Sequence, residues 1–507
     1  MKRSAILLLA VVLFLGGGDS VRSQDGLDRV RTASSWLSSA PLNPPVQPAP
    51  CAPHDPPLAN PATTVTVEVH GWKGFDSAFP PDEVYGRDRS GSHISDTIRL
   101  IGNLPDGLQN PTAPQQVLGT RYYGTIPPAY YTDSDIQEVE ALEGIPRYAL
   151  IVAKHAHHVM ERSGATNVNF VCHSMGGLVT RYLMEHDLEA LVSQGKVARW
   201  VTLAGLIPGA SLARLFGDII VEAAEEYGIN VIDIEHMMPS WVNENVACDG
   251  NGEEGNSPIF GGIYIHHVIA DAYLLEEYSL PLLDLINPGF LPNDAVLFTA
   301  EQHFHGQAPE ARFPAASGEL LEASRSYHEA DHFAIRDSLG AHAAAAAALL
   351  GSRRVRVTLT EMTLLNDEEK DDIFDFGEHG FPPAEIVAES EVSWPYLESL
   401  GIQEFVGERD RNNRVVPVTE MFEGDTAGNL GLVLYDSPVL DEVDEFILKL
   451  RMREVDWYPT EDVLEYIFDV DDSMGTAVLT LPVEAQTFQL NLPSVVVKLN
   501  VAVYTLY

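Results

Sequence analysis

One short segment constrains the fold of this chain more than any other: an apolar strand, a serine and a helix follow one another without a linker. The strand over 167–173 leads directly to Ser174, and Met175-Gly176-Gly177 then begins a helical pattern that continues over 178–186. Such a sharp turn admits only small neighbours and lifts the serine hydroxyl clear of the sheet. Cys172 occupies the position where a glycine is usual, and its side chain is small enough to fit. The segment therefore predicts a nucleophilic Ser174 at the end of a parallel strand.

Strands and helices alternate on both sides of this segment. The predicted strands cover 63–70, 167–173, 199–206 and 262–270, and the predicted helices cover 148–162, 178–186 and 338–350. Alternation of this kind is typical of an α/β fold, in which a mostly parallel sheet has helices on both faces.

The pattern changes after Gly351. Short, alternating, β-branched segments follow over 355–360, 431–435, 477–481 and 495–507, and acidic turns separate them. They predict a second, all-β domain of the sandwich kind.

The N-terminus has the pattern of an export signal. Met1-Lys2-Arg3 precedes an apolar run over 5–15 that is too short to span a membrane, and a small-residue cleavage site follows near 21–23. A proline-dense stretch comes next, which favours an extended linker. We therefore predict a secreted or periplasmic protein without a transmembrane segment. Its parts are a signal peptide (1–23), a linker (24–61), a catalytic domain (62–351) and an acidic β-rich accessory domain (352–507).

The net charge limits which classes of molecule this protein is expected to bind. The 507 residues include 31 Lys plus Arg against 74 Asp plus Glu, for a formal net charge of −43. A surface this acidic repels phosphate backbones, so nucleic acid is excluded as the expected partner. Of the three cysteines, Cys51 and Cys248 lie in polar surroundings that suit a disulfide in an oxidising compartment, with unpaired thiols as the alternative. Cys172 is expected to be a buried thiol.

A second segment supports the nucleophile. His70-Gly71-Trp72 ends the early strand. In a fold with a serine at such a turn, the loop after this strand supplies one backbone N–H to the oxyanion hole, and the residue after the serine supplies the other. These donors are Trp72 and Met175. The alternative for the early segment is a glycine turn with a core tryptophan.

The base and the acid should follow the serine in the order acid, then histidine. His332 lies on a polar loop before the alanine-rich helix and is the preferred base, with His328 as the alternative. His342 lies within that helix and is expected to be structural. For the acid we prefer Asp294 in Asn293-Asp294-Ala295-Val296, with Asp271 at the end of the preceding strand as the alternative.

Together these segments resemble the bacterial triacylglycerol lipases and related esterases of the α/β-hydrolase superfamily. The resemblance rests on the stretch 164–178 around Ser174, on His70-Gly71-Trp72, on Asn293-Asp294-Ala295-Val296 and on Met237-Met238-Pro239-Ser240-Trp241. It departs at Ala295, where the family has glycine, and at 204–210, which lacks the family's Pro-His-x-Gly-Thr. The resemblance implies the α/β-hydrolase fold over about 63–351 and hydrolysis of carboxylic esters, lipid-like ones first.

An insertion between the strands at 199–206 and 262–270 has a helical apolar stripe. A mobile lid would suit a lipase, whereas a helix packed permanently on the sheet is the simpler interpretation. The stripe consists of Leu212, Leu215, Phe216, Ile219, Ile220 and Ala223.

No cofactor is required by this chemistry. The histidine groups (His155, His157 and His158; His266 and His267; His303 and His305) lack the companions of a zinc site. Acidic turns of the tail provide the hard oxygen ligands that Ca²⁺ prefers, and solvated turns are the alternative. Their residues are Asp371, Asp372, Asp375, Asp469, Asp471 and Asp472.

The resulting hypothesis is a secreted serine ester hydrolase that acts on an ester or lipid substrate. The alternatives are another acyl hydrolase (a thioesterase, a polyester depolymerase or an amidase) and a protein with an inert hydrolase-like domain. In that second alternative, the β-rich tail would bind a cell surface or a polymer.

Overall fold

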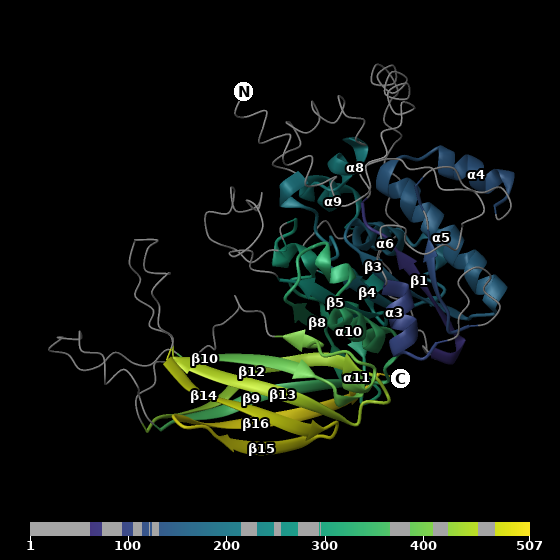
Figure 1. The fold of residues 1–507 in the computed structure, drawn as a ribbon. Helices are drawn as coiled ribbons and strands as arrows, with labels where there is room; N and C mark the ends of the chain where they lie inside the picture. Colours follow the sequence, from purple (N-terminus) through teal and green to yellow (C-terminus); the bar gives the residue numbers. More distant parts are fainter. Residues whose placement is uncertain are drawn as a thin grey trace.

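The computed structural model describes most of the two predicted domains (Figure 1). The described residues are 61–72, 94–104, 114–120, 122–123, 131–213, 231–247, 255–271, 294, 296–365, 386–408, 424–454 and 472–506. Several predictions lie outside them: the signal peptide, the linker up to residue 60, Cys51, Cys248, Asp371, Asp372, Asp375, Asp469 and Asp471. Asp472 is the first residue of a strand.

Six parallel strands form the centre of the molecule, in the order β8-β5-β4-β3-β1-β2. All residues of β1, β3, β4 and β5 are buried, which is expected where helices cover both faces of a sheet. This order and the helices described next give the α/β-hydrolase fold that was predicted. The strands are β1 (Thr64–Val69), β2 (Val117–Thr120), β3 (Asn167–His173), β4 (Val197–Leu203), β5 (Tyr264–Ala270) and β8 (Ser324–His328).

Two helical layers enclose this sheet. Helices α3 (Ile94–Ile101) and α10 (Leu339–Leu350) share one hydrophobic core, and α5 (Gly144–Ser163) and α6 (Met175–Glu185) share the other. The alanines of α10 let the helix lie close to the strands, and Ser338 caps its first turn by accepting the Ala341 N–H at 3.2 Å. The predicted helices and strands of this part are therefore confirmed within a few residues.

The shorter elements connect these layers. The helices are α4 (Asp133–Glu140), α8 (Val231–His236), α9 (Pro239–Asn245) and α11 (Pro395–Ser399), and the small strands are β6 (Phe313–Pro314) and β7 (Leu320–Leu321). The 3-10 turns are η1 (Pro61–Thr63), η2 (Leu188–Ala190), η3 (Pro258–Phe260), η5 (Thr299–Gln302), η6 (Pro309–Ala311) and η7 (Ala334–Arg336).

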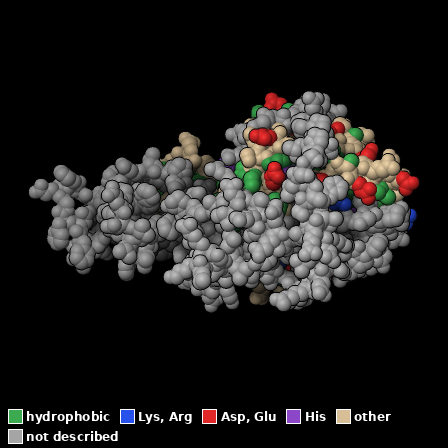
Figure 2. Space-filling view, turned by 90° about the horizontal axis from the view of Figure 1, so that it is seen from above, with side chains coloured by type: hydrophobic (Ala, Val, Ile, Leu, Met, Phe, Trp, Pro, Cys, Tyr) green, Lys and Arg blue, Asp and Glu red, His purple; other side chains and the backbone are tan. Residues whose placement is uncertain are grey.

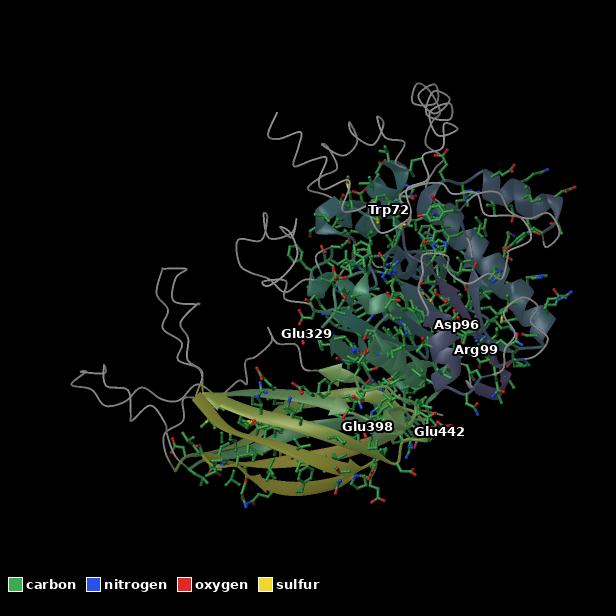
Figure 3. All side chains as sticks on the ribbon, viewed as in Figure 1. Trp72, Asp96, Arg99, Glu329, Glu398 and Glu442 are labelled. Carbon is green, nitrogen blue, oxygen red and sulfur yellow. The ribbon has the colours of Figure 1, made fainter. Side chains whose placement is uncertain are left out.

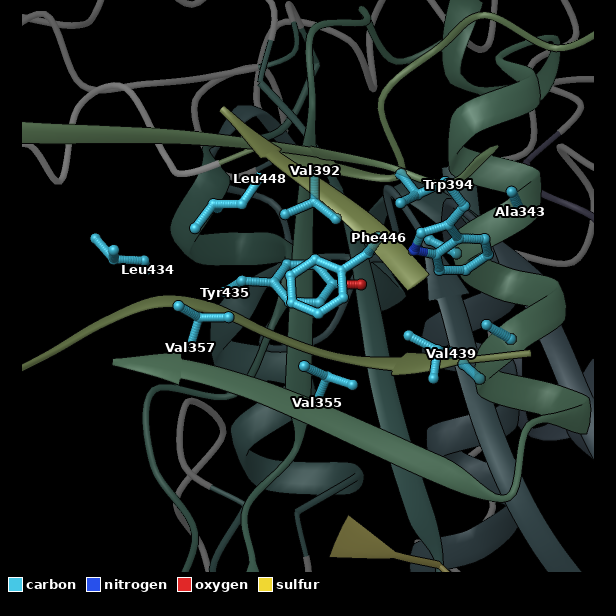
Figure 4. Packing of buried hydrophobic residues seen from close by; sticks show 14 of the residues in the cluster. Ala343, Val355, Val357, Val392, Trp394, Leu434, Tyr435, Val439, Phe446 and Leu448 are labelled. Carbon is cyan, nitrogen blue, oxygen red and sulfur yellow. The ribbon is translucent and has the colours of Figure 1, made fainter. Parts of the chain in front are cut away.

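The C-terminal part is a two-sheet β-sandwich, as predicted. One sheet has the order β14-β13-β10-β11 and the other β12-β9-β16-β15. Apolar side chains fill the space between them; Val355 from β9, Tyr435 from β12 and Phe446 from β13 meet there (Figure 4). The strands are β9 (Arg353–Leu364), β10 (Ile386–Ser393), β11 (Gly407–Glu408), β12 (Thr426–Val439), β13 (Glu445–Glu454), β14 (Asp472–Pro482), β15 (Gln486–Asn491) and β16 (Val495–Thr505).

The junction between the two parts is closer than the sequence indicated. Strand β11 pairs antiparallel with β8, so the first sheet of the sandwich continues the central sheet into one sheet of ten strands. One hydrophobic core also runs from α10 into the sandwich. A Cβ added to Gly351 would lie 2.1 Å from the Val439 carbonyl oxygen, so the chain passes between the parts with no room for a side chain. The boundary at 351–352 stays a prediction, but the two parts share their sheet and their core.

Buried polar groups also join the two parts. Arg354 on β9 donates to both carboxylate oxygens of Asp436 on β12, at 2.6 and 2.7 Å, and to the Glu322 carbonyl oxygen at 2.6 Å. The Glu404 carboxylate accepts the Gly340 N–H at 2.8 Å and so caps α10 from the sandwich side. The bonds to Glu322 and Gly340 cross from one part to the other and give these backbone groups partners where the sandwich covers them.

The surface has the acidic character expected from the composition. Seen from above, the described side chains of the α/β part show red Asp and Glu groups scattered over the face, with little blue (Figure 2). Among the described residues, no helix is both long and apolar enough to cross a membrane.

Candidate active site

Ser174 occupies the sharp turn between β3 and α6. Its backbone has φ 52° and ψ −128°, a conformation that is costly for a residue with a Cβ and that clusters at functional sites. Two glycines beside Ser174, Gly176 in the turn and Gly71 in the loop after β1, have no room for a side chain. A Cβ on Gly176 would lie 2.4 Å from the Val69 carbonyl oxygen, and one on Gly71 would lie 2.8 Å from the Ser174 Cβ. The small residues of the segment are thus explained by the close approach of the end of β1 to the serine.

Cys172 is compatible with this turn. Its side chain is fully buried, and its Sγ lies 3.2 Å from the Thr180 Oγ1 on α6. Burial raises the pKa of the Cys172 thiol to about 12, so it stays protonated. The prediction of a buried free thiol is confirmed.

Three residues from distant parts of the chain form one hydrogen-bonded row. The His332 Nε2 lies 2.8 Å from the Ser174 Oγ, and the His332 Nδ1 lies 2.7 Å from the Asp294 Oδ2. Asp294 and His332 are 0% and 3% exposed. With Nδ1–H donating to the carboxylate, Nε2 carries the lone pair that accepts the serine proton. The structure therefore brings together the serine, the acid and the base that the sequence favoured.

The Asp294 carboxylate is held on both oxygens. Its Oδ1 accepts the N–H groups of Val296 at 2.9 Å and Leu297 at 2.6 Å. Its Oδ2 accepts from His332 and also from the Gln302 Nε2 at 3.3 Å. A buried carboxylate needs such donors, because burial without them is costly. Asp294 thus sits in a preformed site facing His332.

The alternative residues lie elsewhere. His328 ends β8, and its Nε2 lies 3.1 Å from the Ser326 Oγ on the same strand. Burial lowers the pKa of His328 to about 3, so its imidazole is a poor proton acceptor near neutral pH. Asp271 donates its backbone N–H to the His328 carbonyl oxygen, and His342 is buried within α10, as expected. None of these three residues belongs to the row of Ser174, His332 and Asp294.

The loop after β1 lies beside the serine. The Tyr122 hydroxyl donates to the carbonyl oxygens of His70 at 2.6 Å and Gly71 at 3.1 Å, and its ring stacks on His70 at 4.0 Å between centroids. These contacts fix the backbone that leads to Trp72, which lies on the side of the molecule away from the sandwich (Figure 3). Met175 is the first residue of α6, so its N–H points out of the helix N-terminus. The assignment of both N–H groups to an oxyanion hole stays a prediction.

Three residues that support the site carried little signal in the sequence. The His173 Nε2 lies 3.0 Å from the His332 carbonyl oxygen and so ties the nucleophile strand to the base. Gln302 reaches Asp294 from η5, and Tyr122 reaches the loop after β1 from beyond β2. His173 directly precedes the serine, so its place near the site could have been predicted from the sequence. Gln302 and Tyr122 lie in segments without a motif.

The described part of the insertion is packed rather than loose. Leu206 donates its N–H to the Ser174 carbonyl oxygen, and Ser211 donates its N–H to the Glu301 Oε1 at 2.6 Å. Leu212 is 3% exposed, and Trp241 of α9 stacks on His236 with 4.0 Å between centroids. Leu212 is the one residue of the predicted apolar stripe that the structure describes, so the choice between a mobile lid and a permanently packed helix stays a prediction. The remainder of the apolar stripe lies outside the described residues: Leu215, Phe216, Ile219, Ile220 and Ala223.

An exposed aromatic side chain adjoins the base. Phe333, next to the base, is 41% exposed and packs edge-on against the His332 imidazole, with 5.5 Å between centroids. It offers an apolar surface beside the histidine.

Among the described residues, no group of three or more His, Cys, Asp or Glu side chains is arranged to hold a metal ion.

Comparison with known proteins gives only distant structural likeness. No family model and no curated sequence matches the chain. Among solved structures, the mature lipase BlEst2 of Bacillus licheniformis is 15% identical, with a TM-score of 0.34, covering 56% of this chain and 90% of that one. Phospholipase PlaB from Legionella pneumophila is 10% identical, with a TM-score of 0.33, covering 83% and 89%. A structure titled as a C2 domain is 11% identical, with a TM-score of 0.16, covering 30% and 99%. Because these likenesses are so distant, the function is inferred from the chain's own geometry.

Proposed function

We propose that this chain is a serine hydrolase that cleaves carboxylic esters through an acyl-enzyme, with Ser174 as nucleophile, His332 as base and Asp294 as acid. The observation that carries the proposal is the row of hydrogen bonds at 2.8 and 2.7 Å that joins the three side chains, with Ser174 on a strained turn. A row with this order and direction is the arrangement that activates a serine hydroxyl.

The steps follow from the geometry. His332 takes the Ser174 proton as the hydroxyl oxygen attacks the ester carbonyl, and Asp294 stabilises the imidazolium that forms. The N–H groups of Met175 and Trp72 would stabilise the tetrahedral oxyanion. His332 then protonates the departing alcohol, and water attacks the acyl-enzyme with His332 as base again. The products are a carboxylic acid and an alcohol, and Ser174 is regenerated.

The exposed Phe333 ring favours an ester with an apolar portion. Because the leaving alcohol would receive its proton from His332, a bound ester would lie close to the Phe333 ring that contacts this imidazole. An apolar alcohol or lipid-like substrate would bury the ring, which stabilises the complex by the hydrophobic effect. Secretion remains part of the proposal on the pattern of residues 1–23. Thioesters, polyesters and amides could be attacked by the same three residues, so specificity depends on the shape of the pocket.

Hydrolysis of a p-nitrophenyl ester series with short to long acyl chains tests the proposal. The protein without residues 1–23 should hydrolyse at least part of the series, and Ser174→Ala should fold normally and lose at least about a thousandfold in kcat. Ser193→Ala, on an exposed turn, is the matched control and should keep full turnover. Turnover that survives Ser174→Ala would assign the activity to another group. A folded wild-type protein that attacks none of the esters would favour the binding-protein alternative.

A further inference from the structure

Gln302 is the one side chain besides His332 that donates to Asp294 among the described residues. It is fully buried, and its Nε2 lies 3.3 Å from the Asp294 Oδ2, the same oxygen that receives the His332 Nδ1–H. A buried primary amide that faces both the acid and the protein backbone is a costly group to place, because each of its polar atoms needs a partner.

The other bonds of Gln302 lock its amide to the end of β5. The Oε1 accepts the Ala270 N–H at 2.8 Å, and the Nε2 donates to the Ala270 carbonyl oxygen at 2.9 Å. The amide therefore pairs with both backbone groups of Ala270, as a neighbouring strand residue would. Strand β4 ends at Leu203, and the last backbone bond from it to β5 runs from the Ala204 N–H to the Val268 carbonyl oxygen. Beyond the end of β4, the Gln302 amide thus makes the hydrogen bonds to β5 that a strand residue would make.

This double attachment determines where the remaining N–H of Gln302 points. With one Nε2 proton on the Ala270 carbonyl oxygen, the planar amide directs its second proton at the Asp294 Oδ2. The Oδ1 is held by the backbone N–H groups of Val296 and Leu297. The Asp294 carboxylate is therefore held to the central sheet through Gln302, and to its own loop through the bonds to Oδ1.

We propose that Gln302 is a positioning residue that orients the Asp294 carboxylate toward His332 by coupling it to the end of β5. This inference rests on the proposed function, since its catalytic consequence needs the Ser174–His332–Asp294 row to be active. Gln302 acts through Asp294 and is not in contact with the ester, so its loss should lower kcat and leave KM unchanged. An error of about 1 Å in the placement of a catalytic group costs up to about a hundredfold in rate.

Gln302→Met tests this, because methionine has similar volume and offers no N–H donor. We expect kcat to fall about tenfold on the best p-nitrophenyl ester, with KM unchanged within about twofold. In an Asp294→Asn background, where the carboxylate to be oriented is gone, the same substitution should lower kcat by less than about twofold. An equal loss in both backgrounds, or a loss confined to KM, would overturn the proposal.

Gln307→Met is the matched control for the structural part of the change. Gln307 is also a buried amide with backbone partners, since its Nε2 donates to the Ala311 carbonyl oxygen at 3.1 Å and its Oε1 accepts the Ala323 N–H at 2.6 Å. Among the described residues, it forms no hydrogen bond with the three residues of the row. Its replacement should lower the melting temperature by a similar amount and leave kcat unchanged. If Gln307→Met lowered kcat as much as Gln302→Met, the effect would be one of general stability.

A readout that does not depend on turnover separates this proposal from the proposed function. The hydrogen-bonded His332 Nδ1–H should give a low-field proton NMR signal that is lost in Asp294→Asn. Gln302→Met should shift or broaden that signal, and Gln307→Met should leave it in place. A shifted signal in a protein without esterase activity would support the positioning role while removing the proposed function. An unchanged signal together with unchanged kcat would refute the positioning role alone.

Discussion

The two halves of this molecule differ in how far their strands are buried, although they share one sheet of ten strands. The central strands β1, β3, β4 and β5 are buried along their whole length, and their carboxyl ends lead to the loops that hold Ser174, Asp294 and His332. In the sandwich strand β15, by contrast, half-buried and exposed residues alternate: Gln486, Phe488 and Leu490 are half-buried, and Thr487, Gln489 and Asn491 are exposed. The comparison teaches that the α/β part holds the row of Ser174, His332 and Asp294, whereas the sandwich contributes sheet and core to the fold.

The shared core makes removal of the sandwich the change with the largest expected effect. Deleting 352–507 would expose the face of α10 and leave the polar groups at the junction without partners. We expect residues 62–351 alone to be insoluble or protease-sensitive, because the usual stability of a domain is only about 5–15 kcal/mol and part of the core is removed. Limited proteolysis and circular dichroism check this. A truncated protein that unfolds cooperatively and keeps full turnover would show that the two halves are independent.

Breaking the ion pair at the junction should have a smaller effect. Arg354 is 1% exposed, and Arg354→Met leaves the Asp436 carboxylate without its two closest donors and the Glu322 carbonyl oxygen unpaired. We expect a loss of about 3 kcal/mol in the free energy of unfolding. Turnover per titrated serine should not change, because the pair lies in the junction and not in the row. Urea unfolding and active-site titration measure the two quantities.

The same substitution at an exposed position is its control. Arg451 on β13 bonds to the Glu389 carboxylate on β10 at 3.3 Å, and its side chain is 40% exposed. Arg451→Met should cost less than about 1 kcal/mol. If both variants lost the same stability, the buried junction would have no special part in joining the halves.

Lowering the pH should destabilise the α/β part (62–351) more than the sandwich. Of the 17 histidines, only His379 lies beyond residue 351. Burial lowers the pKa of both His266 and His328 to about 3; His266 faces Arg354, Asp436, Ser324 and Ser326, and His328 faces Ser326 and His342. The unfolded chain takes up these protons below pH 6.5 and the folded chain only near pH 3. Their contribution to stability is therefore present above pH 6.5 and is lost progressively as the pH falls toward 3.

Between pH 7 and pH 6 this loss is below about 1 kcal/mol for each such histidine. His328→Gln, which keeps a donor near Ser326, should make the melting temperature less dependent on pH in this range. His305→Gln, at an exposed position, is the control. A wild-type protein whose melting temperature is the same at pH 6 and pH 7 would contradict the expectation.

Much of the fold follows from local pattern. The strand over Asn167–His173, the glycines around Ser174 and the alanine-rich helix after Ser338 are properties of short segments, so hydrophobic period and turn chemistry suffice to predict them. The alternating segments of the tail likewise predict a sandwich. The order of serine, acid and histidine along the chain also follows, because the fold imposes it.

Local pattern favoured His332 over His328 but left the alternative open, and only the tertiary structure shows which of the two side chains meets Ser174. His332 and His328 are four residues apart in similar surroundings, yet the side chain of His332 reaches Ser174, 158 positions away, whereas His328 ends a strand and bonds to Ser326. The continuation of the central sheet through β11 and the bond from Gln302 to Asp294 are equally invisible in the sequence. A sequence pattern reports what each segment can bury, but which distant groups meet depends on long-range packing of the whole chain.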